Sequence, residues 1–512
     1  MIKPYSRATT RRSLLSNCKL TAMRLPSNRQ TILVLVVLFS LFNFKCEKDL
    51  QGYSSPGLSD FGSVNTTKFD AITENPFVRT DVEPTSTFSI DADGGSYAMV
   101  RRLVGNNTLS TYREAIRTEE LINYFTYDYP NPLGNDPIAV NGEVSECPWK
   151  AGHKLIRIGI KGKPIEREQY PLANFVLLID VSGSMSSPDK LELLKTGFIE
   201  FVQQMRPQDR LAIVKYAGAE GLHLESTPGT QKDKIINAIK SLGASGSTNG
   251  AAGIKLAYEI AEKNFIQGGN NRVILGTDGD FNVGIVSTEE LVKLIEEKRE
   301  KGVFLTSLGV GADNLNEAMM EKVANRGNGN YEYIDSKEEM VKVFVDEYNK
   351  FLTVAKDVKV QVTFNKDLVE EYRLIGYENR KLNNQDFTDD KKDAGEIGAG
   401  QTITAIYQIK PRYHPNYKTI PSFTINFRYK FPTGAESQPM SLDIFDNGKT
   451  FTGASENLRF AASLAATGMY LRDSRYMGDV TLNQIQQWAQ SAKTFDPNGY
   501  RKKHLSLLQT IK

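Results

Sequence analysis

The sequence has few of the residues that build disulfide scaffolds and zinc sites. It contains three cysteines and four histidines among 512 residues, and the histidines show no zinc-ligand spacing. We expect Cys18 to be removed when an N-terminal export segment is cleaved, and Cys46, which follows that segment, to carry a lipid. Cys147 would then have no other cysteine in the chain with which to form a disulfide. Packed cores, rather than disulfides, must therefore stabilise the chain.

The chain also lacks a basic surface in the part that would fold. Its net charge is +2, but residues 1–45 carry eight Lys or Arg and no acid, so the remainder is at 2 − 8 = −6. Nucleic-acid binding modules usually show a clustered positive excess. The charge distribution therefore excludes nucleic acid as the expected partner. The basic residues of 1–45 are instead expected to belong to a segment that targets the chain for export.

No apolar run in the sequence is long enough to cross a bilayer, which needs about 20 residues. The longest, TILVLVVLFSLF at 31–42, has 12 residues and follows a cationic stretch, as in a secretory signal peptide. Met23 is an alternative start that gives a signal of conventional length. Cys46 follows at the place of a lipoprotein's acylated cysteine, although Lys45 and Asn43 depart from that pattern. We expect a membrane-anchored lipoprotein, with the acidic CEKD start favouring the outer membrane; plain secretion or an uncleaved anchor is the alternative.

Hydrophobic periodicity divides the rest of the chain. Between 172 and 350, apolar strand-like runs alternate with amphipathic helices, which predicts an α/β, doubly wound, Rossmann-like domain. After 355 the pattern alternates with period two, as in an antiparallel sandwich, and 455–512 is helical. Before the α/β domain, REAIRTEELINYFTYDYP predicts a helix that ends before Pro130.

Two extended runs, at 137–147 and 153–161, precede the α/β domain but alternate like the strands that follow it. We predict that they pair with strands of 357–445. The α/β domain would then be an insertion in a β-rich body, and its two ends, near 170 and 352, would lie close together.

Hydroxyl and carboxylate side chains gather where strands of the α/β domain are expected to end. The run FVLLIDVSGSM ends a strand with Asp180, Ser182 and Ser184, and further loops carry Thr248 in GASGSTNG and Asp278 in VILGTDGDFN. Ligands bind at the carboxyl ends of strands in such sheets. All-oxygen ligands suit Mg²⁺. The alternative is that the two serines only cap the helix expected from about residue 188.

These motifs, in this order, resemble a von Willebrand factor A domain with a metal-ion-dependent adhesion site. The resemblance implies that Ser182, Ser184 and Thr248 bind the metal directly, while Asp180 and Asp278 act largely through water. The flanks, including RTEELINYFTYDYP and DAGEIGAGQTITAIY, resemble bacterial YfbK-type lipoproteins. The expected organisation is a signal peptide at 1–45, a tether at 46–85, an N-terminal A-domain-associated region at 86–170, the A domain at 171–352, a β-rich region at 353–450 and a helical region at 451–512.

Three alternatives compete for the function or for a second site. Asp91 and Asp93 in SIDADGG resemble the first motif of haloacid-dehalogenase-type phosphatases, but Gly95 stands where that motif has Thr or Val. The acidic loop DFTDDKKDAGE at 386–396 could bind calcium, although its spacing fails the EF-hand template. The chain could also be a purely structural envelope subunit whose metal is never exposed.

We expect a binding protein rather than an enzyme. The ion is expected to be Mg²⁺, with Mn²⁺ or Ca²⁺ as substitutes, and it would accept an acidic side chain from a protein partner. The lipid anchor would hold the chain on the periplasmic or the surface face of its membrane.

Overall fold

The computed structural model describes residues 69, 72–90, 93–218, 220–247, 250–279, 288–311 and 315–511. All of them belong to the compact unit Ser63–Lys512. The signal peptide, Cys46, Asp91 and Thr248 lie outside the described residues. Among the helices that are described, none combines the length and the apolar character needed to cross a bilayer.

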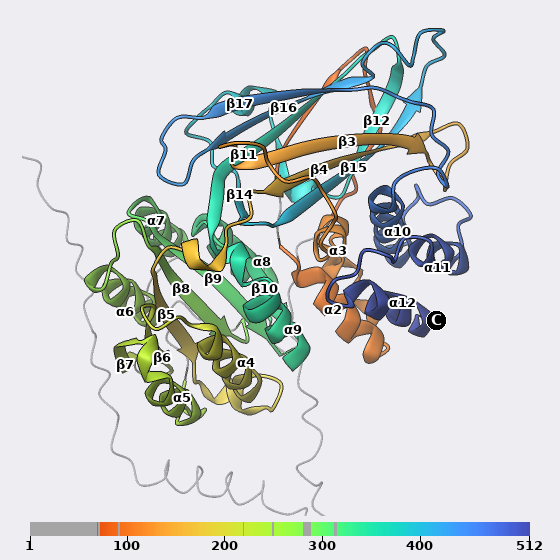
Figure 1. Cartoon of the computed structure of the whole chain (residues 1–512). Coiled ribbons are helices and arrows are strands. Elements are labelled where there is room, and N and C mark those ends of the chain that lie inside the picture. The colour runs from red at the N-terminus through yellow and green to blue at the C-terminus, as the bar shows by residue number, and fades with distance from the viewer. Residues whose placement is uncertain are drawn as a thin grey trace, which may run out of the picture. The chain divides into compact units, whose positions relative to one another are not determined.

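A six-stranded sheet forms the centre of the A domain, in the order β10-β9-β8-β5-β6-β7 (Figure 1). Neighbouring strands are parallel, except that β7 runs antiparallel to β6. In that order the strands are Tyr331–Ile334, Val303–Val310, Asn270–Thr277, Ala173–Asp180, Arg210–Tyr216 and Glu220–Pro228. Every residue of β5 is buried, which explains its nearly continuous apolar sequence.

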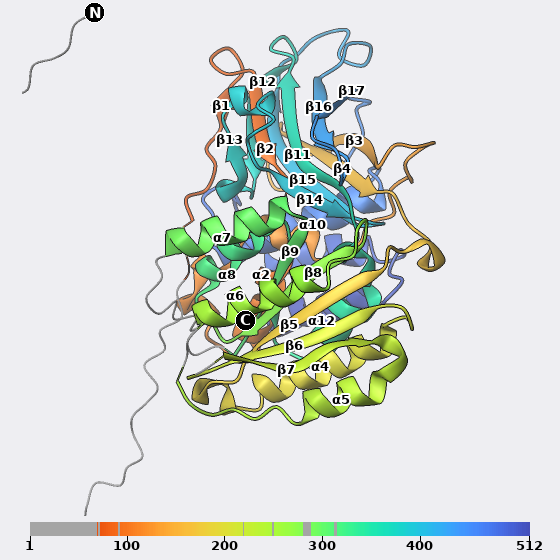
Figure 2. The ribbon, with the colours of Figure 1, turned by 90° about the vertical axis from the view of Figure 1, so that its left-hand side faces the viewer.

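Helices cover both faces of this sheet, so the doubly wound prediction is confirmed. Alternate residues of β5 point to opposite cores: Phe175 and Leu177 enter one, Val176 and Leu178 the other. The first core is closed by α4 (Leu191–Gln204), α5 (Lys232–Lys240) and α9 (Lys337–Val341), which continues as a π turn over Lys342–Asp346. The second is closed by α6 (Gly250–Lys263), α7 (Thr288–Glu300) and α8 (Glu317–Arg326), and Figure 2 shows α4 and α5 on one side of the strands and α6 and α7 on the other.

Helix α2 (Gly95–Gly105), which precedes the A domain in sequence, also packs on its sheet. Met99 and Leu103 of α2 belong to the same buried core as Val176 and Leu178. Tyr97 and Val100, on another side of the helix, belong to the core of the C-terminal helices. Helix α2 thus contributes side chains both to a core of the A domain and to the core of the C-terminal helices.

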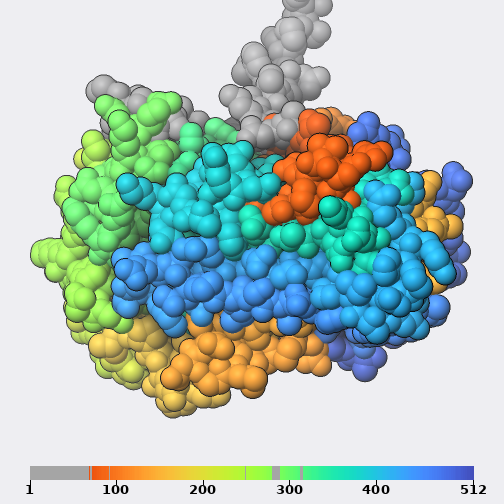
Figure 3. All heavy atoms as spheres, turned by 90° about the horizontal axis from the view of Figure 1, so that it is seen from above, coloured from red at the N-terminus to blue at the C-terminus, as the bar shows by residue number. Residues whose placement is uncertain are grey.

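Two antiparallel sheets form the β-rich body, and their facing side chains share one core. One sheet has the order β1-β12-β15-β4-β3, and its strands are Val78–Arg79, Val369–Ile375, Thr402–Pro411, Lys154–Gly162 and Ile138–Glu146. The other has the order β13-β2-β11-β16-β17, with β14 pairing β11, and its strands are Lys381–Leu382, Thr85–Ser89, Thr353–Phe364, Phe423–Lys430, Gln438–Ile444 and Gly395–Gly398. In the view from above, the orange segment near residue 80 lies beside cyan segments from the chain after the A domain (Figure 3).

The sandwich is assembled from segments on both sides of the A domain, and the predicted pairing is confirmed for the second of the two runs. Strand β4 pairs with β15 along its length, whereas β3 pairs with β4 and forms the edge of that sheet. Strand β2, which also precedes the A domain, pairs with β11. The ends of the inserted domain meet as expected, because the rings of Tyr170 and Tyr348 stack with their centroids 5.9 Å apart.

The predicted helix before Pro130 is much shorter than expected. Only α3 (Thr118–Asn123) is α-helical, preceded by a 3-10 turn at Arg113–Ala115. Beyond it the backbone leaves the helix, because Tyr127 and Tyr129 are buried with their rings stacked at 5.3 Å, and the Tyr127 N–H donates to Thr402 Oγ1 at 3.1 Å. Tertiary burial of the tyrosines overrides the local helical pattern.

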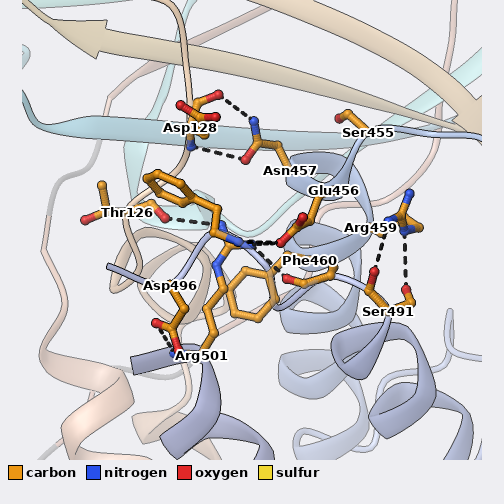
Figure 4. Close-up of polar contacts among 12 residues, drawn as sticks. Thr126, Asp128, Ser455, Glu456, Asn457, Arg459, Phe460, Ser491, Asp496 and Arg501 are labelled. Carbon is orange, nitrogen blue, oxygen red and sulfur yellow. Dashed lines mark hydrogen bonds and ion pairs between the residues drawn. The ribbon is translucent and has the colours of Figure 1, made fainter. Parts of the chain in front are cut away.

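The C-terminal helices α10 (Glu456–Leu471), α11 (Leu482–Gln490) and α12 (Tyr500–Thr510) pack around a buried arginine (Figure 4). Arg501 is 1% exposed and donates to the carbonyl oxygens of Ala492 at 2.8 Å and Thr126 at 3.3 Å. It also meets Glu456 Oε1 at 3.3 Å and lies 4.1 Å from the centroid of the Phe460 ring. One guanidinium therefore joins α10, α12 and the segment after α3.

Replacing this arginine tests its part in holding the helical region. Arg501→Ala should lower the free energy of unfolding by about 2–4 kcal/mol, because two carbonyls and a carboxylate lose a buried charged donor. The exposed neighbour Lys502 supplies the control, since Lys502→Ala should change stability by less than about 0.5 kcal/mol. Urea unfolding followed by circular dichroism measures both. Equal losses in the two variants would contradict this account.

Candidate functional site

The site begins at the carboxyl end of β5, the strand between β6 and β8. Asp180, its last residue, is 0% exposed. Its Oδ1 accepts the Ser182 N–H at 2.9 Å, and its Oδ2 accepts from Thr277 Oγ1, at the end of β8, at 3.0 Å. Thr277 Oγ1 in turn accepts the Gly279 N–H at 3.2 Å. Two strand ends thus fix the orientation of one buried carboxylate.

The two serines of the motif are held side by side just beyond Asp180. Ser182 is buried, Ser184 is partly exposed in the 3-10 turn Gly183–Ser186, and their Oγ atoms lie 3.0 Å apart. The helix-capping alternative is not what the structure shows. Helix α4 begins at Leu191, and within the described contacts its N-cap residue, Lys190, makes no side-chain cap hydrogen bond.

The loop that leads to Thr248 is fastened to this motif by its backbone. The Ser245 N–H donates to the Val181 carbonyl at 2.7 Å, and the Gly183 N–H donates to the Gly246 carbonyl at 2.9 Å. Gly246 has φ +86°, a left-handed conformation that favours glycine at this close approach. The structure thus brings the end of the described part of this loop, at Ser247, to the motif, while Thr248 itself lies outside the described residues.

Asp278 lies directly beyond β8 and is 0% exposed. Its Oδ2 accepts from Lys190 Nζ at 2.9 Å, and the side chains of this pair are 5% and 0% exposed. The sequence interpretation missed Lys190. The signal was its position at the start of a helix, where a cation is electrostatically unfavourable and so needs a compensating partner.

Burial dominates the electrostatics of the site. It raises the pKa of Asp180, opposed by the hydrogen bonds from Ser182 and Thr277 and reinforced by the nearby charge of Asp278. Burial, followed by the charge of Asp180, raises the pKa of Tyr216, which is 0% exposed at the end of β6. Two carboxyl groups held close together in a buried place favour a cation beside them.

The donor set fits a small hard cation. In an octahedral Mg²⁺ site with bonds of about 2.1 Å, neighbouring oxygens are about 3.0 Å apart, the square root of two times the bond length. The Ser182 and Ser184 Oγ atoms already have a separation of 3.0 Å. Within the described ranges, no three His, Cys, Asp or Glu side chains form a group that could hold a metal. A metal at this motif would therefore depend on the serine hydroxyls as direct ligands.

The other candidate residues make structural contacts. Asp93 is 2% exposed and accepts the Tyr331 N–H at 3.0 Å and Arg380 Nη2 at 3.2 Å. In the acidic loop, Asp390 pairs with Arg428 at 3.1 Å and Asp393 with Arg299 at 2.7 Å, while Asp386 accepts the Asn383 N–H at 3.0 Å. Cys147 is a free buried thiol, and burial raises its pKa to about 12, far from that of a nucleophile.

Comparison with known proteins extends over most of the chain. The family model described as the C-terminal part of the uncharacterized protein YfbK matches residues 349–512. A von Willebrand factor model matches 63–157, and a von Willebrand factor type A domain model matches 175–280. Human inter-alpha-trypsin inhibitor heavy chain H4 is 25% identical over 200 residues, 37% of this chain and 21% of that protein.

The von Willebrand factor type A structure from Catenulispora acidiphila aligns with 75% of this chain and 91% of its own, with 13% identity and a TM-score of 0.41. The uncharacterized protein YfbK of Escherichia coli (strain K12) is 42% identical over 471 residues, covering 87% of this chain and 81% of that protein. The chain therefore belongs to the YfbK family of von Willebrand factor A-domain proteins.

Proposed function

We propose that this chain is an exported lipoprotein that captures a protein partner through a divalent metal ion in its A domain. The observation that carries the proposal is the pair of serine hydroxyls 3.0 Å apart beyond the buried Asp180. Such a pair at the carboxyl end of a central parallel strand is suited to ligand binding. Binding, rather than catalysis, is the proposed role.

The expected ion is Mg²⁺, with Mn²⁺ or Ca²⁺ as substitutes. Ser182, Ser184 and Thr248 would ligate it directly, and Asp180 and Asp278 would act largely through water. Because hydroxyls are neutral ligands, the bound ion would stay electrophilic and could accept a carboxylate from a partner as a further ligand. The chemistry of the site thus favours a partner that presents an exposed Asp or Glu.

The chain's N-terminal segment supports an envelope location. The tether expected at 46–85 must end before β1, because Val78–Arg79 pairs with β12 in the sandwich. The apolar run at 31–42, the following Cys46 and this shorter tether would attach the folded unit to a lipid anchor. We propose the outer membrane as the destination. A phosphatase centred on Asp91 and Asp93 is less favoured, because Asp93 is buried in contacts with Tyr331 and Arg380.

Metal binding and partner capture should depend on the same oxygens. Asp180→Ala and Thr248→Ala should each weaken Mg²⁺ binding by about 10–100-fold in titration calorimetry, since they remove a group that orients or ligates the ion. Capture of a partner from solubilised membranes should fall in both variants, and EDTA should have the same effect on the wild type. Added Mg²⁺ or Mn²⁺ should restore capture only in the wild type.

Ser186→Ala provides the matched control, because Ser186 is exposed in the same turn but outside the motif. It should bind Mg²⁺ and the partner like the wild type. Circular dichroism should show a folded protein for every variant. Normal partner capture by Asp180→Ala or Thr248→Ala in EDTA would refute the metal mechanism and favour a structural subunit.

Lipidation can be tested separately from binding. Cys46→Ser should release the protein from membranes or leave its signal uncleaved, because it removes the acyl-accepting thiol. Membrane fractionation with immunoblotting measures both outcomes, and Cys147→Ser is the control. Unchanged membrane retention with normal processing would contradict the lipoprotein assignment.

A further inference from the structure

The buried ammonium group of Lys190 contacts Asp278, one of the two carboxylates of the proposed metal site. Lys190 is 4% exposed, and its Nζ lies 2.9 Å from Asp278 Oδ2. Asp278 is 0% exposed, so this contact is made without solvent screening. The site therefore already contains a cation that belongs to the chain itself.

The structure has a dedicated place for this lysine. Its aliphatic stem lies against Gly311, just beyond β9, where φ is +74°. A Cβ at position 311 would collide with the Lys190 stem, from Cγ to Cε. Position 311 therefore requires a glycine. The packing of the Lys190 stem against Gly311 directs the ammonium group toward Asp278.

Neither its place at the start of helix α4 nor the neighbouring Asp189 explains why residue 190 is a lysine. Lys190 is the N-cap of α4, and a positive charge at a helix N-terminus is unfavourable. Asp189, the adjacent acid in sequence, pairs instead with Arg102 of α2 at 2.8 Å and accepts from Ser187 Oγ at 2.6 Å. The contact with Asp278 is the favourable interaction that offsets burying this charge.

We propose that Lys190 is an internal counter-ion of the metal site, which holds Asp278 when no metal is bound and competes with the metal for that carboxylate. This inference rests on the proposed function. A divalent ion placed beside Asp278 meets the ammonium group at the same carboxylate, and the two cations repel each other in a buried setting. Lys190 thus stabilises the metal-free site and weakens metal binding.

The test removes the positive charge of Lys190 and keeps a side chain of similar length. Lys190→Met should bind Mg²⁺ about 10-fold more tightly than the wild type in titration calorimetry, because the competing cation is gone. Its melting temperature in EDTA should be lower than that of the wild type by several degrees, because Asp278 is left buried and unbalanced. The gain in affinity should vanish when both proteins also carry Asp278→Asn.

Two further variants keep the result interpretable. Lys195→Met makes the same change of charge on the same helix, at a lysine whose Nζ donates to Glu192 at 2.7 Å and to the Leu242 carbonyl at 3.1 Å, and it should leave the Mg²⁺ affinity unchanged. Lys190→Gln, which retains a donor for Asp278, serves if the methionine variant does not fold and should also bind Mg²⁺ more tightly.

The outcomes separate this inference from the proposed function. If Lys190→Met binds Mg²⁺ with the affinity of the wild type or more weakly, the competition is refuted while the metal site stands. If neither protein binds Mg²⁺ at millimolar concentration, the metal site itself is refuted, and the competition with it.

Discussion

The pairing of β4 with β15 is the constraint on which the rest of the molecule depends. These strands are separated in sequence by the whole A domain, yet their residues pair from Lys154 to Lys161. Joining such distant segments costs loop-closure entropy, which rises only slowly with length, so the insertion is tolerated if its ends return to one place. The stacked rings of Tyr170 and Tyr348 mark that place.

Helix α2 extends this constraint to the functional site. It is buried on one side with the A-domain strands and on another with the C-terminal helices. Its Arg102 donates to Asp189 at 2.8 Å and to the Tyr333 hydroxyl at 3.0 Å, and Tyr333 donates to the Gly311 carbonyl at 2.8 Å. The residues that flank and support Lys190 are therefore held from outside the inserted domain. Arg102 thus links α2 to the residues that flank the proposed metal site.

Local patterns predicted most of the fold. The buried run of β5, the period-two strands after 355 and the amphipathic helices each follow from residue periodicity, which reports directly on burial. The oxygens of Asp180 and Ser182 could be placed at a strand end for the same reason. The pairing of Lys190 with Asp278 could not, because 88 residues separate them and only the tertiary structure brings them together. The non-helical backbone around Tyr127 could not be predicted from local pattern either, because its burial against β15 is also a tertiary effect.

The proposed mechanism requires the hydroxyls of Ser182 and Ser184 to be direct ligands of the metal ion. The most direct measurement is anomalous diffraction from crystals of the full-length protein soaked in Mn²⁺. We predict a single strong peak within about 2.3 Å of both Ser182 Oγ and Ser184 Oγ. A peak elsewhere, or none at these hydroxyls at millimolar Mn²⁺, would contradict the account.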